Sequence, residues 1–371
     1  MTRKHLLVAA ALLALGVLAW DLTRSKPAVT PVSAAVAFKS ATAPGSMSPA
    51  AAQAMPRPAD VMKAPNFLRP AAVSHTTSSQ LARDFGNALA YKPIYDQLKG
   101  TAAGETPEGQ YFLYRILRAC ATVADRKGGA RSQSAAQAEE RRQQIAASLP
   151  EGDPRIAQRL AAFDKVSADQ CVGLSGTTVT EAELGQMLRN ALSGNDPKAR
   201  AWQVEQEMWQ ERRNAAGTNR AGPTLSDTQI ATLRDAFSAR DPEAIAIAGR
   251  VLANSFRDVT VRVGPEQEAI EHRTFMNAAT LLACEYGYAC GENNPRVLAA
   301  CAYQGHCGVA SLPDYLFYYG VSPYDAQLLD RYRTILRQAV DTGDWSGINI
   351  QRGTRSPNAP SFTFQGLPPG R

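Results

Sequence analysis

Hydrophobic residues recur every three or four positions through most of the chain after residue 77. This period places apolar side chains on one face of an α-helix. Two such faces are formed by Phe112, Ile116, Cys120 and Val123 and by Leu329, Tyr332, Leu336 and Val340. Only residues 257–263 (RDVTVRV) resemble a strand, and we interpret them as an extended connector between helices.

The predicted helix starts share one signal, a capping residue followed by proline. A Ser, Thr, Asp or Asn side chain accepts hydrogen bonds from the first-turn amides, and proline is tolerated next because its missing N–H needs no partner. The pairs are Thr106-Pro107, Asp153-Pro154, Asp196-Pro197, Asp241-Pro242, Asn294-Pro295 and Ser322-Pro323. Thr180 with Glu183, and Ser226 with Gln229, predict capping boxes at two further helices.

A short motif recurs as LRNALSGNDP at 188–197, LRDAFSARDP at 233–242 and LRQAVDTGDW at 336–345. In the first two copies it describes the end of one helix, a turn, and the capped start of the next. Helix pairs thus recur about every 45 residues in the middle of the chain. We predict an all-α fold stapled by disulfides, either stacked αα-hairpins (solenoid-like) or an irregular helical bundle.

Helix pairs joined through such a turn, with an Ala-rich second helix, resemble Sel1-like and tetratricopeptide-type helical repeats. The resemblance rests on residues 188–197 and 233–242, and less closely on 336–345. It implies helix pairs that stack along the chain. The Cys-rich C-terminal segment is also similar to a region of uncharacterised exported α-helical proteins of proteobacteria, and that similarity implies no particular activity.

The N-terminus predicts export. A basic start, Thr2 to His5, precedes an apolar run at residues 6–20. No small-residue cleavage site follows directly, so residues 1–20 are either a cleaved signal peptide or an uncleaved signal anchor. Both alternatives place the rest of the chain in the periplasm. In the second, residues 6–20 hold it at the inner membrane and are its only contact with the membrane.

Composition divides the rest of the chain. Residues 21–76 are rich in Ala, Pro and Ser and predict a flexible tether. Residues 77–346 form the predicted helical domain, with a Cys- and Tyr-rich subregion at 266–346, and residues 347–371 predict a disordered tail. The net charge is +6 over 371 residues, and acidic and basic residues are interleaved. This pattern lacks the basic patch that nucleic-acid binding requires.

Six cysteines in an exported protein predict three disulfides. We expect Cys120 to pair with Cys171. The other four lie in two copies of C-x-Y-x-x-x-C-G within residues 284–308. They pair either locally, as Cys284–Cys290 and Cys301–Cys307, or as Cys284–Cys301 and Cys290–Cys307. Zinc held by four thiolates is less favoured because the spacing exceeds that of zinc knuckles, so we expect no metal and no cofactor.

Few residues are candidates for catalysis. Glu268 precedes His272 by four residues, and we interpret the two as a surface pair on a helix rather than an acid–base pair. Glu285, beside Cys284, is the first carboxylate to test as a catalytic acid. His306 adjoins Cys307 and is expected to be structural or exposed. No nucleophile, metal-ligand or phosphate-binding motif occurs, so we assign no catalytic residue.

Tyrosines are concentrated near the C-terminus, where eight of the twelve fall between Tyr286 and Tyr332. They either pack around the disulfides or form an aromatic surface for a partner. The candidates for partner binding are Tyr286, Tyr288, Tyr303, Tyr315, Tyr318 and Tyr319.

We therefore expect an exported protein-interaction or scaffolding module of the cell envelope rather than an enzyme, with an envelope protein or a glycan as its partner. The alternative is a periplasmic hydrolase or lyase that acts on a cell-wall glycan with a single carboxylate as the acid. A deep cleft around a buried carboxylate would favour the enzyme, and a shallow surface with exposed tyrosines would favour the module.

Overall fold

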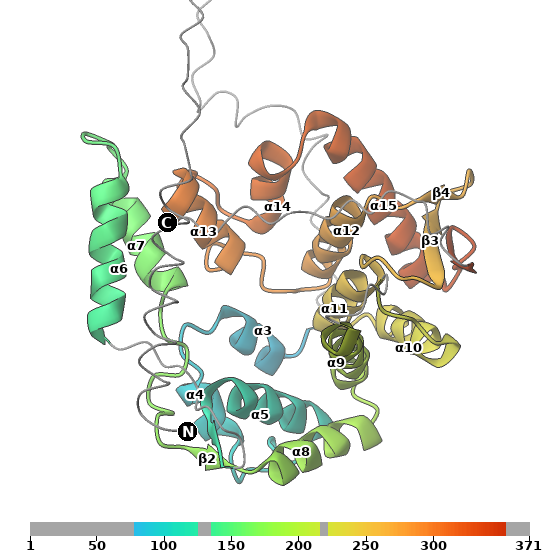
Figure 1. Ribbon diagram of the computed structural model, residues 1–371, viewed down its shortest axis with the longest axis horizontal. Helices are drawn as coiled ribbons and strands as arrows, with labels where there is room; N and C mark the ends of the chain where they lie inside the picture. The colour runs from blue at the N-terminus through green and yellow to red at the C-terminus, as the bar shows by residue number, and fades with distance from the viewer. Residues whose placement is uncertain (1–77, 125–134, 216–221, 354–371) are drawn as a thin grey trace, which may run out of the picture. The chain divides into compact units, whose positions relative to one another are not determined.

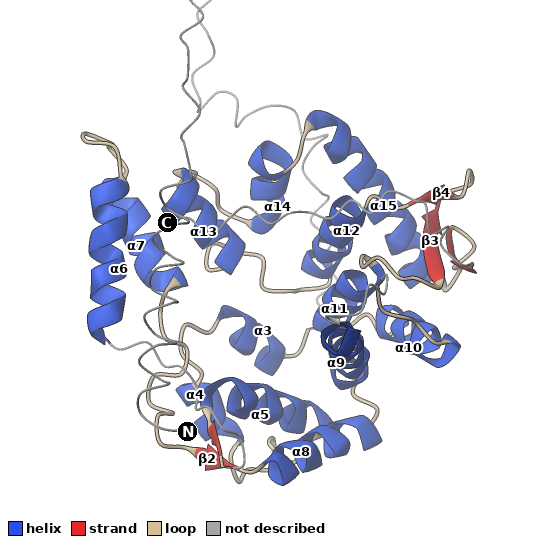
Figure 2. Cartoon of the chain, in the orientation of Figure 1, coloured by secondary structure: helices blue, strands red, loops and turns tan. Residues whose placement is uncertain are grey.

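The computed structural model describes residues 78–124, 135–215 and 222–353 (Figure 1). These residues are mostly helical with little strand (Figure 2), which confirms the helical fold class. The predicted signal segment 1–20, the tether 21–76 and residues 354–371 of the predicted tail lie outside the described residues. Within the described ranges, no helix is both long enough and apolar enough to cross a membrane.

The helices of the first half are α3 (Gln80–Asn87), α4 (Lys92–Leu98), α5 (Pro107–Cys120), α6 (Ala135–Ser148), α7 (Ile156–Val166), α8 (Glu181–Ser193) and α9 (Pro197–Ala215). Those of the second half are α10 (Asp227–Ser238), α11 (Pro242–Leu252), α12 (His272–Glu285), α13 (Pro295–Gln304), α14 (Leu312–Tyr315) and α15 (Pro323–Thr342). A π-helical turn, η2 (Leu316–Gly320), follows α14 directly. The strands are β1 (Thr122–Val123), β2 (Thr178–Val179), β3 (Val259–Val263), β4 (Glu268–Ala269) and β5 (Ile348–Arg352).

The predicted helix starts are confirmed at five of the six proline positions. Thr106, Asp196, Asp241, Asn294 and Ser322 each accept a first-turn amide through the side chain. Both predicted capping boxes are also present. At Asp153 the prediction is wrong, because α7 begins at Ile156 and Asp153 instead accepts the Arg155 N–H in the preceding turn. A capping residue and the amides that it binds lie within a few positions of each other, so caps can be predicted from the sequence alone.

The interpretation of residues 257–263 as a connector is wrong. Val259–Val263 is β3, the central strand of an antiparallel sheet with the order β4-β3-β5. Its register pairs Val261 with Ile350, so the tail predicted from residue 347 contributes strand β5. The partner strands are separated by α12 to α15, and for this reason no local pattern shows the pairing. A second, two-stranded sheet pairs β1 with β2 in parallel.

The largest hydrophobic core gathers α9 to α12 and α15. In that region α11 packs against α9, α10 and α12, and α12 also packs against α15. Gly249 of α11 allows the backbones of α11 and α12 to come close together. A Cβ added at this position would fall 2.1 Å from the Ala279 Cβ of α12. The α11–α12 crossing therefore depends on a missing side chain.

A second hydrophobic cluster surrounds α5, with contributions from α4 and α8. Trp202 of α9 packs against both this cluster and the larger core. The Arg115 guanidinium lies 4.1 Å from the Trp202 ring centroid, and its Nη1 is 2.7 Å from the Glu243 Oε1 of α11. The Tyr111 hydroxyl donates to the same Glu243 oxygen at 2.9 Å. This polar group joins α5 to α9 and α11.

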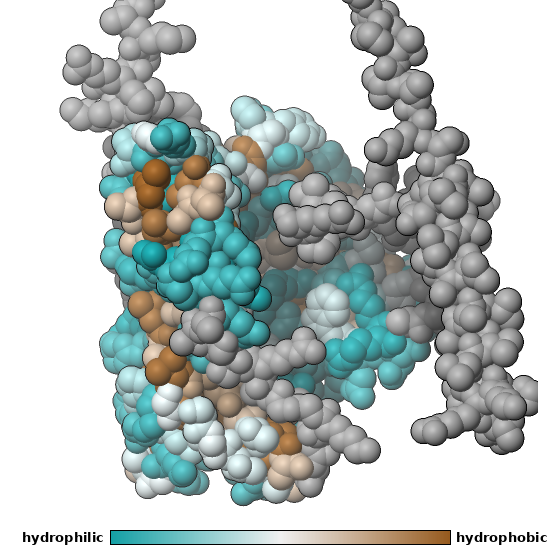
Figure 3. All heavy atoms as spheres, turned by 60° about the vertical axis from the view of Figure 1, so that its left-hand side comes forward, coloured by the Kyte–Doolittle hydropathy of each residue, from teal (hydrophilic) through white to brown (hydrophobic). Residues whose placement is uncertain are grey.

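A third, smaller cluster forms where α7 packs against α13. Phe163 of α7 contacts Tyr303 edge-on, and Arg159 donates to the Ala302 carbonyl. Figure 3 views the side of the molecule on which α6 and α7 lie and shows hydrophobic patches separated by polar side chains. This side therefore carries no continuous apolar surface among the residues coloured there.

All six cysteines form disulfides, which confirms that prediction and leaves no thiolate for zinc. The pairs are Cys120–Cys171, Cys284–Cys290 and Cys301–Cys307. The last two are the local pairing of the two alternatives. The first bridges the end of α5 to the segment after α7, whereas each of the others closes a loop at the end of one helix.

Candidate functional site

The two stapled loops reverse the chain after α12 and after α13. Gly287 and Gly305 adopt positive φ angles of 101° and 77°, the left-handed region that favours glycine. Gly305 caps α13, and the following His306 N–H returns to the Ala300 carbonyl. The Cys301–Cys307 bond closes this turn. The backbone at His306 is therefore held from both sides.

His306 stacks on Tyr319, with ring centroids 4.0 Å apart and an angle of 18° between the planes. Tyr318 is the next neighbour, with its ring centroid 6.5 Å from that of Tyr319. Both tyrosines are in the π-helical turn η2, and 41% of Tyr318 and 48% of Tyr319 is exposed. We call His306, Tyr318 and Tyr319 the aromatic rim.

The structure does not bring all six predicted tyrosines together. Tyr286 is buried, and its hydroxyl donates to Asp341, so it is not part of an exposed surface. Tyr288 is half-buried against the main core. Tyr315 is half-buried as well, and its hydroxyl donates to the Gln304 side chain. Tyr303 is exposed, but its ring contacts α7 rather than the aromatic rim.

Glu285 is paired with two arginines. Arg333 Nη1 donates to its Oε1 at 2.9 Å, and Arg337 Nε donates to its Oε2 at 2.7 Å. Only 6% of the Glu285 side chain is exposed. Both carboxylate oxygens are therefore occupied by guanidinium groups, and the side chain is shielded from any ligand. The geometry therefore does not support Glu285 as a catalytic acid.

The predicted surface pair of Glu268 and His272 is wrong. Glu268 lies in β4 and pairs with Arg331, while His272 is the first residue of α12. His272 instead faces Ser255, whose Oγ is 3.3 Å from the imidazole Nε2, and Nδ1 is 2.9 Å from the Ala253 carbonyl. Because a carbonyl accepts only, Nδ1 carries a proton, and in the neutral imidazole Nε2 then accepts from the Ser255 hydroxyl. Both residues line a cavity of about 220 Å³.

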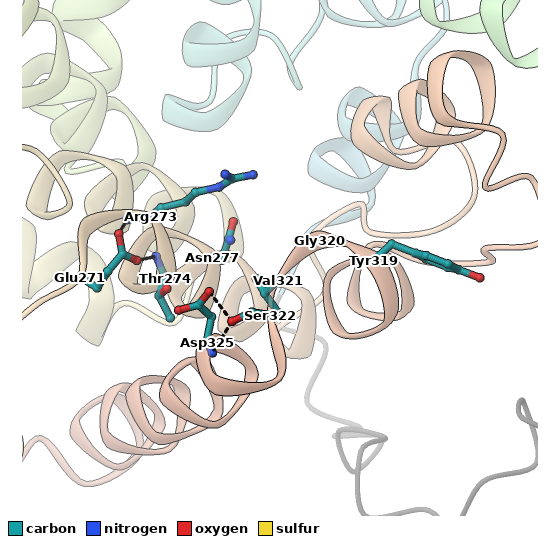
Figure 4. A pocket seen from close by; sticks show the side chains of 9 residues that line it. All are labelled: Glu271, Arg273, Thr274, Asn277, Tyr319, Gly320, Val321, Ser322 and Asp325. Atoms are coloured by element: carbon teal, nitrogen blue, oxygen red, sulfur yellow. Dashed lines mark hydrogen bonds between the residues drawn. The ribbon is translucent and has the colours of Figure 1, made fainter. Parts of the chain in front are cut away.

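A larger pocket, of about 550 Å³, opens between the start of α12 and the junction of η2 with α15 (Figure 4). One wall consists of Glu271, Arg273, Thr274 and Asn277, and the other of Tyr319, Gly320, Val321, Ser322 and Asp325. We call this the α12–α15 pocket. Figure 4 shows the Tyr319 ring pointing away from the pocket, although Tyr319 is part of its lining.

The carboxylates of the α12–α15 pocket both accept hydrogen bonds at the start of a helix. Glu271 accepts the backbone N–H groups of Arg273 and Thr274 at the start of α12. Asp325 accepts the Ser322 hydroxyl at 2.7 Å at the start of α15. The sequence predicted the Ser322 cap, but it gave no sign that the starts of these two helices face one pocket.

Asn277 is fully buried, and its side-chain orientation follows from its neighbour. Arg296 Nη1 lies 3.1 Å from the Asn277 Oδ1. Because arginine only donates, the amide atom that faces it must be the oxygen. The Nδ2 group therefore faces away from Arg296, and it is buried without a hydrogen-bond partner among the described residues. Sequence inspection missed Asn277, because only the surrounding helices reveal an unpaired amide.

Comparisons with known protein families, with curated proteins and with solved structures found no match to this chain.

Proposed function

We propose that the protein is an exported binding module of the cell envelope and that its partner, an envelope protein, docks on the aromatic rim. The observation that carries the proposal is the stacking of His306 on Tyr319, which presents two exposed tyrosines on a fixed backbone. Tyrosine offers a large contact area at a low cost in conformational entropy, and it is enriched among residues that dominate binding energy.

One covalent constraint and one backbone constraint hold the aromatic rim in place before a partner binds. The Cys301–Cys307 bond fixes the loop that carries His306, and the π-helical turn fixes Tyr318 and Tyr319. π-helical turns are rare and occur often at functional sites. A surface that is ordered in advance loses less entropy on binding, so each contact contributes more to affinity.

The disulfides support the proposed compartment. Three disulfides form and persist in an oxidising environment, and a basic, apolar N-terminus is typical of export. We further propose that successive helices stack as αα-hairpins, as the resemblance to Sel1-like and tetratricopeptide-type repeats implies. Contacts of α8 with α9, and of α10 with both α9 and α11, support that arrangement.

The proposal is tested by site-specific photocrosslinking in the native envelope. A benzophenone amino acid at Tyr318 should give a discrete crosslinked species. The same residue at Val172, which is 61% exposed and belongs to a different part of the fold, serves as the control. Combining the Tyr318 probe with the substitutions Tyr319→Ser and His306→Ser should weaken crosslinking about tenfold or more. An unchanged crosslink in that triple variant would refute docking on the aromatic rim.

A second candidate function rests on Ser255 and His272. A serine whose hydroxyl faces an imidazole with a fixed tautomer is the arrangement used for nucleophilic acyl transfer. In such a reaction Ser255 would attack an ester carbonyl, His272 Nε2 would take the hydroxyl proton, and the departing alcohol would receive it. Water would then hydrolyse the acyl-serine and restore Ser255.

The two candidate functions are separated by covalent labelling. A fluorophosphonate probe should modify Ser255, and Ser255→Ala and His272→Gln should both abolish the modification if Ser255 is an activated nucleophile. Ser346, in an exposed turn, is the matched control for a serine without an imidazole neighbour. Absence of labelling in the folded wild-type protein would remove the hydrolase and leave the binding module.

A further inference from the structure

We propose that the α12–α15 pocket binds a small zwitterion, a molecule that carries both a carboxylate and an ammonium group, such as an amino acid. The proposal does not depend on the aromatic rim, because the Tyr319 ring points away from this pocket. It rests on the unpaired Asn277 amide, on two arginines and on the two carboxylates of the pocket.

The Asn277 amide provides the first donor for such a ligand. Its Nδ2 is buried and lacks a partner among the described residues, while its Oδ1 is fixed by Arg296. An unpaired buried donor destabilises a fold unless an acceptor is supplied. Native structures hold few such groups, and this one belongs to the lining of the α12–α15 pocket. A carboxylate oxygen supplies that acceptor.

Positive charge reinforces this preference. The pKa of Arg296 is lowered, chiefly by burial; Tyr315 raises it, and the like charge of Arg273 lowers it. Neither guanidinium takes part in an ion pair within the described ranges. Arg273 is exposed and lines the pocket. A carboxylate placed between Arg273 and Asn277 would relieve the repulsion and satisfy the amide together.

The two carboxylates of the pocket make it unsuited to a simple anion. Asp325 and Glu271 both line the pocket, and their carboxylates accept hydrogen bonds at the two helix starts, from the Ser322 hydroxyl and from the Thr274 N–H. In Figure 4 the Arg273 guanidinium and the Asp325 carboxylate lie on either side of Asn277. A carboxylate oxygen accepts more than one hydrogen bond, so Asp325 can also accept from a ligand ammonium group. A doubly charged phosphate would be repelled by both carboxylates.

The size and polarity of the pocket agree with this ligand class. A volume of about 550 Å³ admits an amino acid with its side chain. Six of the nine lining residues are polar or charged (Glu271, Arg273, Thr274, Asn277, Ser322 and Asp325). Such a lining provides little attraction for an apolar ligand. The chemistry of the walls therefore selects charge at both ends of the bound molecule.

The test measures binding of the standard L-amino acids, one at a time, to the purified full-length protein by titration calorimetry. At least one should bind. Its analogue without the carboxylate and its analogue without the ammonium group should each bind about tenfold more weakly or worse. Failure of every amino acid to bind would overturn the proposal. Equal binding of the analogue without the ammonium group would overturn the zwitterion in favour of a plain anion site.

Two variants place the ligand in this pocket. Asn277→Asp keeps the size of the side chain and gives Arg296 a carboxylate, so the fold is retained while the donor is replaced by a repelling charge. Arg273→Gln removes the exposed cation at the surface. Both should lower affinity about tenfold or more, whereas Arg331→Gln, which changes a half-buried arginine of α15 outside the pocket, should not. Undiminished binding in Asn277→Asp would contradict the proposal.

Discussion

Asp196 and Asp241 cap different helices, yet both carboxylates lie 3.1 Å from the same Lys198 Nζ. They are the equivalent aspartates of the repeated motifs LRNALSGNDP and LRDAFSARDP. Through Lys198, the two copies of the motif bring the starts of α9 and α11 into contact. Glu108, in the first turn of α5, is a third carboxylate at 3.1 Å from this amine. Burial opposes the charged form of Lys198, but these carboxylates outweigh it and raise its pKa.

Lys198→Met should destabilise the fold by about 3 to 5 kcal/mol, because it leaves buried carboxylates without their cation. Chemical denaturation of the purified protein measures the loss. Lys92→Met is the control, because Lys92 forms only an exposed i,i+4 pair with Asp96 and should contribute less than about 1 kcal/mol. Equal losses in the two variants would contradict a structural role for the Lys198 cluster.

The Cys120–Cys171 bond should contribute more to stability than either local staple. It spans a sequence separation of 51, whereas each of the others spans 6. Chain entropy predicts about 4 kcal/mol for the long loop and about 2 kcal/mol for each short one. Paired Cys→Ser variants of each bond, unfolded in denaturant, measure this order. A larger loss from either short loop would show that strain or local packing dominates.

Gly249→Ala should destabilise the protein by about 1 to 3 kcal/mol, because the added methyl group collides with Ala279 where α11 crosses α12. Thermal unfolding provides the readout. Combining Gly249→Ala with Ala279→Gly should restore part of the loss, since the methyl group then moves to the other helix. Gly291→Ala, with open space at its Cβ position, is the control. A double variant no more stable than the single one would contradict the packing explanation.

Acid should weaken the start of α8. The Thr180 N–H and hydroxyl bind the Glu183 carboxylate and lower its pKa. Because the pKa is lower in the folded than in the unfolded state, this contribution is present above the unfolded value and is lost as pH falls through the folded one. NMR titration of Glu183 should show a midpoint below that of an unfolded peptide. In Glu183→Gln the stability should depend less on pH in this acidic range, and an unchanged dependence would refute the contribution.

Local signals in this chain were predictable and distant ones were not. Thr106, Asn294 and Ser322 could be assigned as caps because a cap and its amides lie within a few residues. The spacing of the clustered cysteines left two pairings open, and the structure has the local one. Strand β5 could not be foreseen, because its partner β3 lies on the other side of four helices.

The candidate site shows the same contrast between local and distant signals. Composition shows that tyrosines gather near the C-terminus, but burial separates Tyr286 from Tyr318 and Tyr319. Asn277 is one polar residue in an otherwise unremarkable helix until Arg296 fixes its amide. Side-chain burial and hydrogen bonding depend on several elements at once, and these properties distinguish a binding residue from a structural one.

The pairing of β3 with β5 also determines when the sheet can be completed during synthesis of the chain. During synthesis the ribosome releases β3 well before β5, and α12 to α15 emerge between them. Until β5 arrives, the β3 edge that it covers offers unpaired N–H and C=O groups, and such edges recruit strands from other chains. A nascent chain stopped before Ile348 would contain every disulfide and every described helix and would still be prone to aggregate.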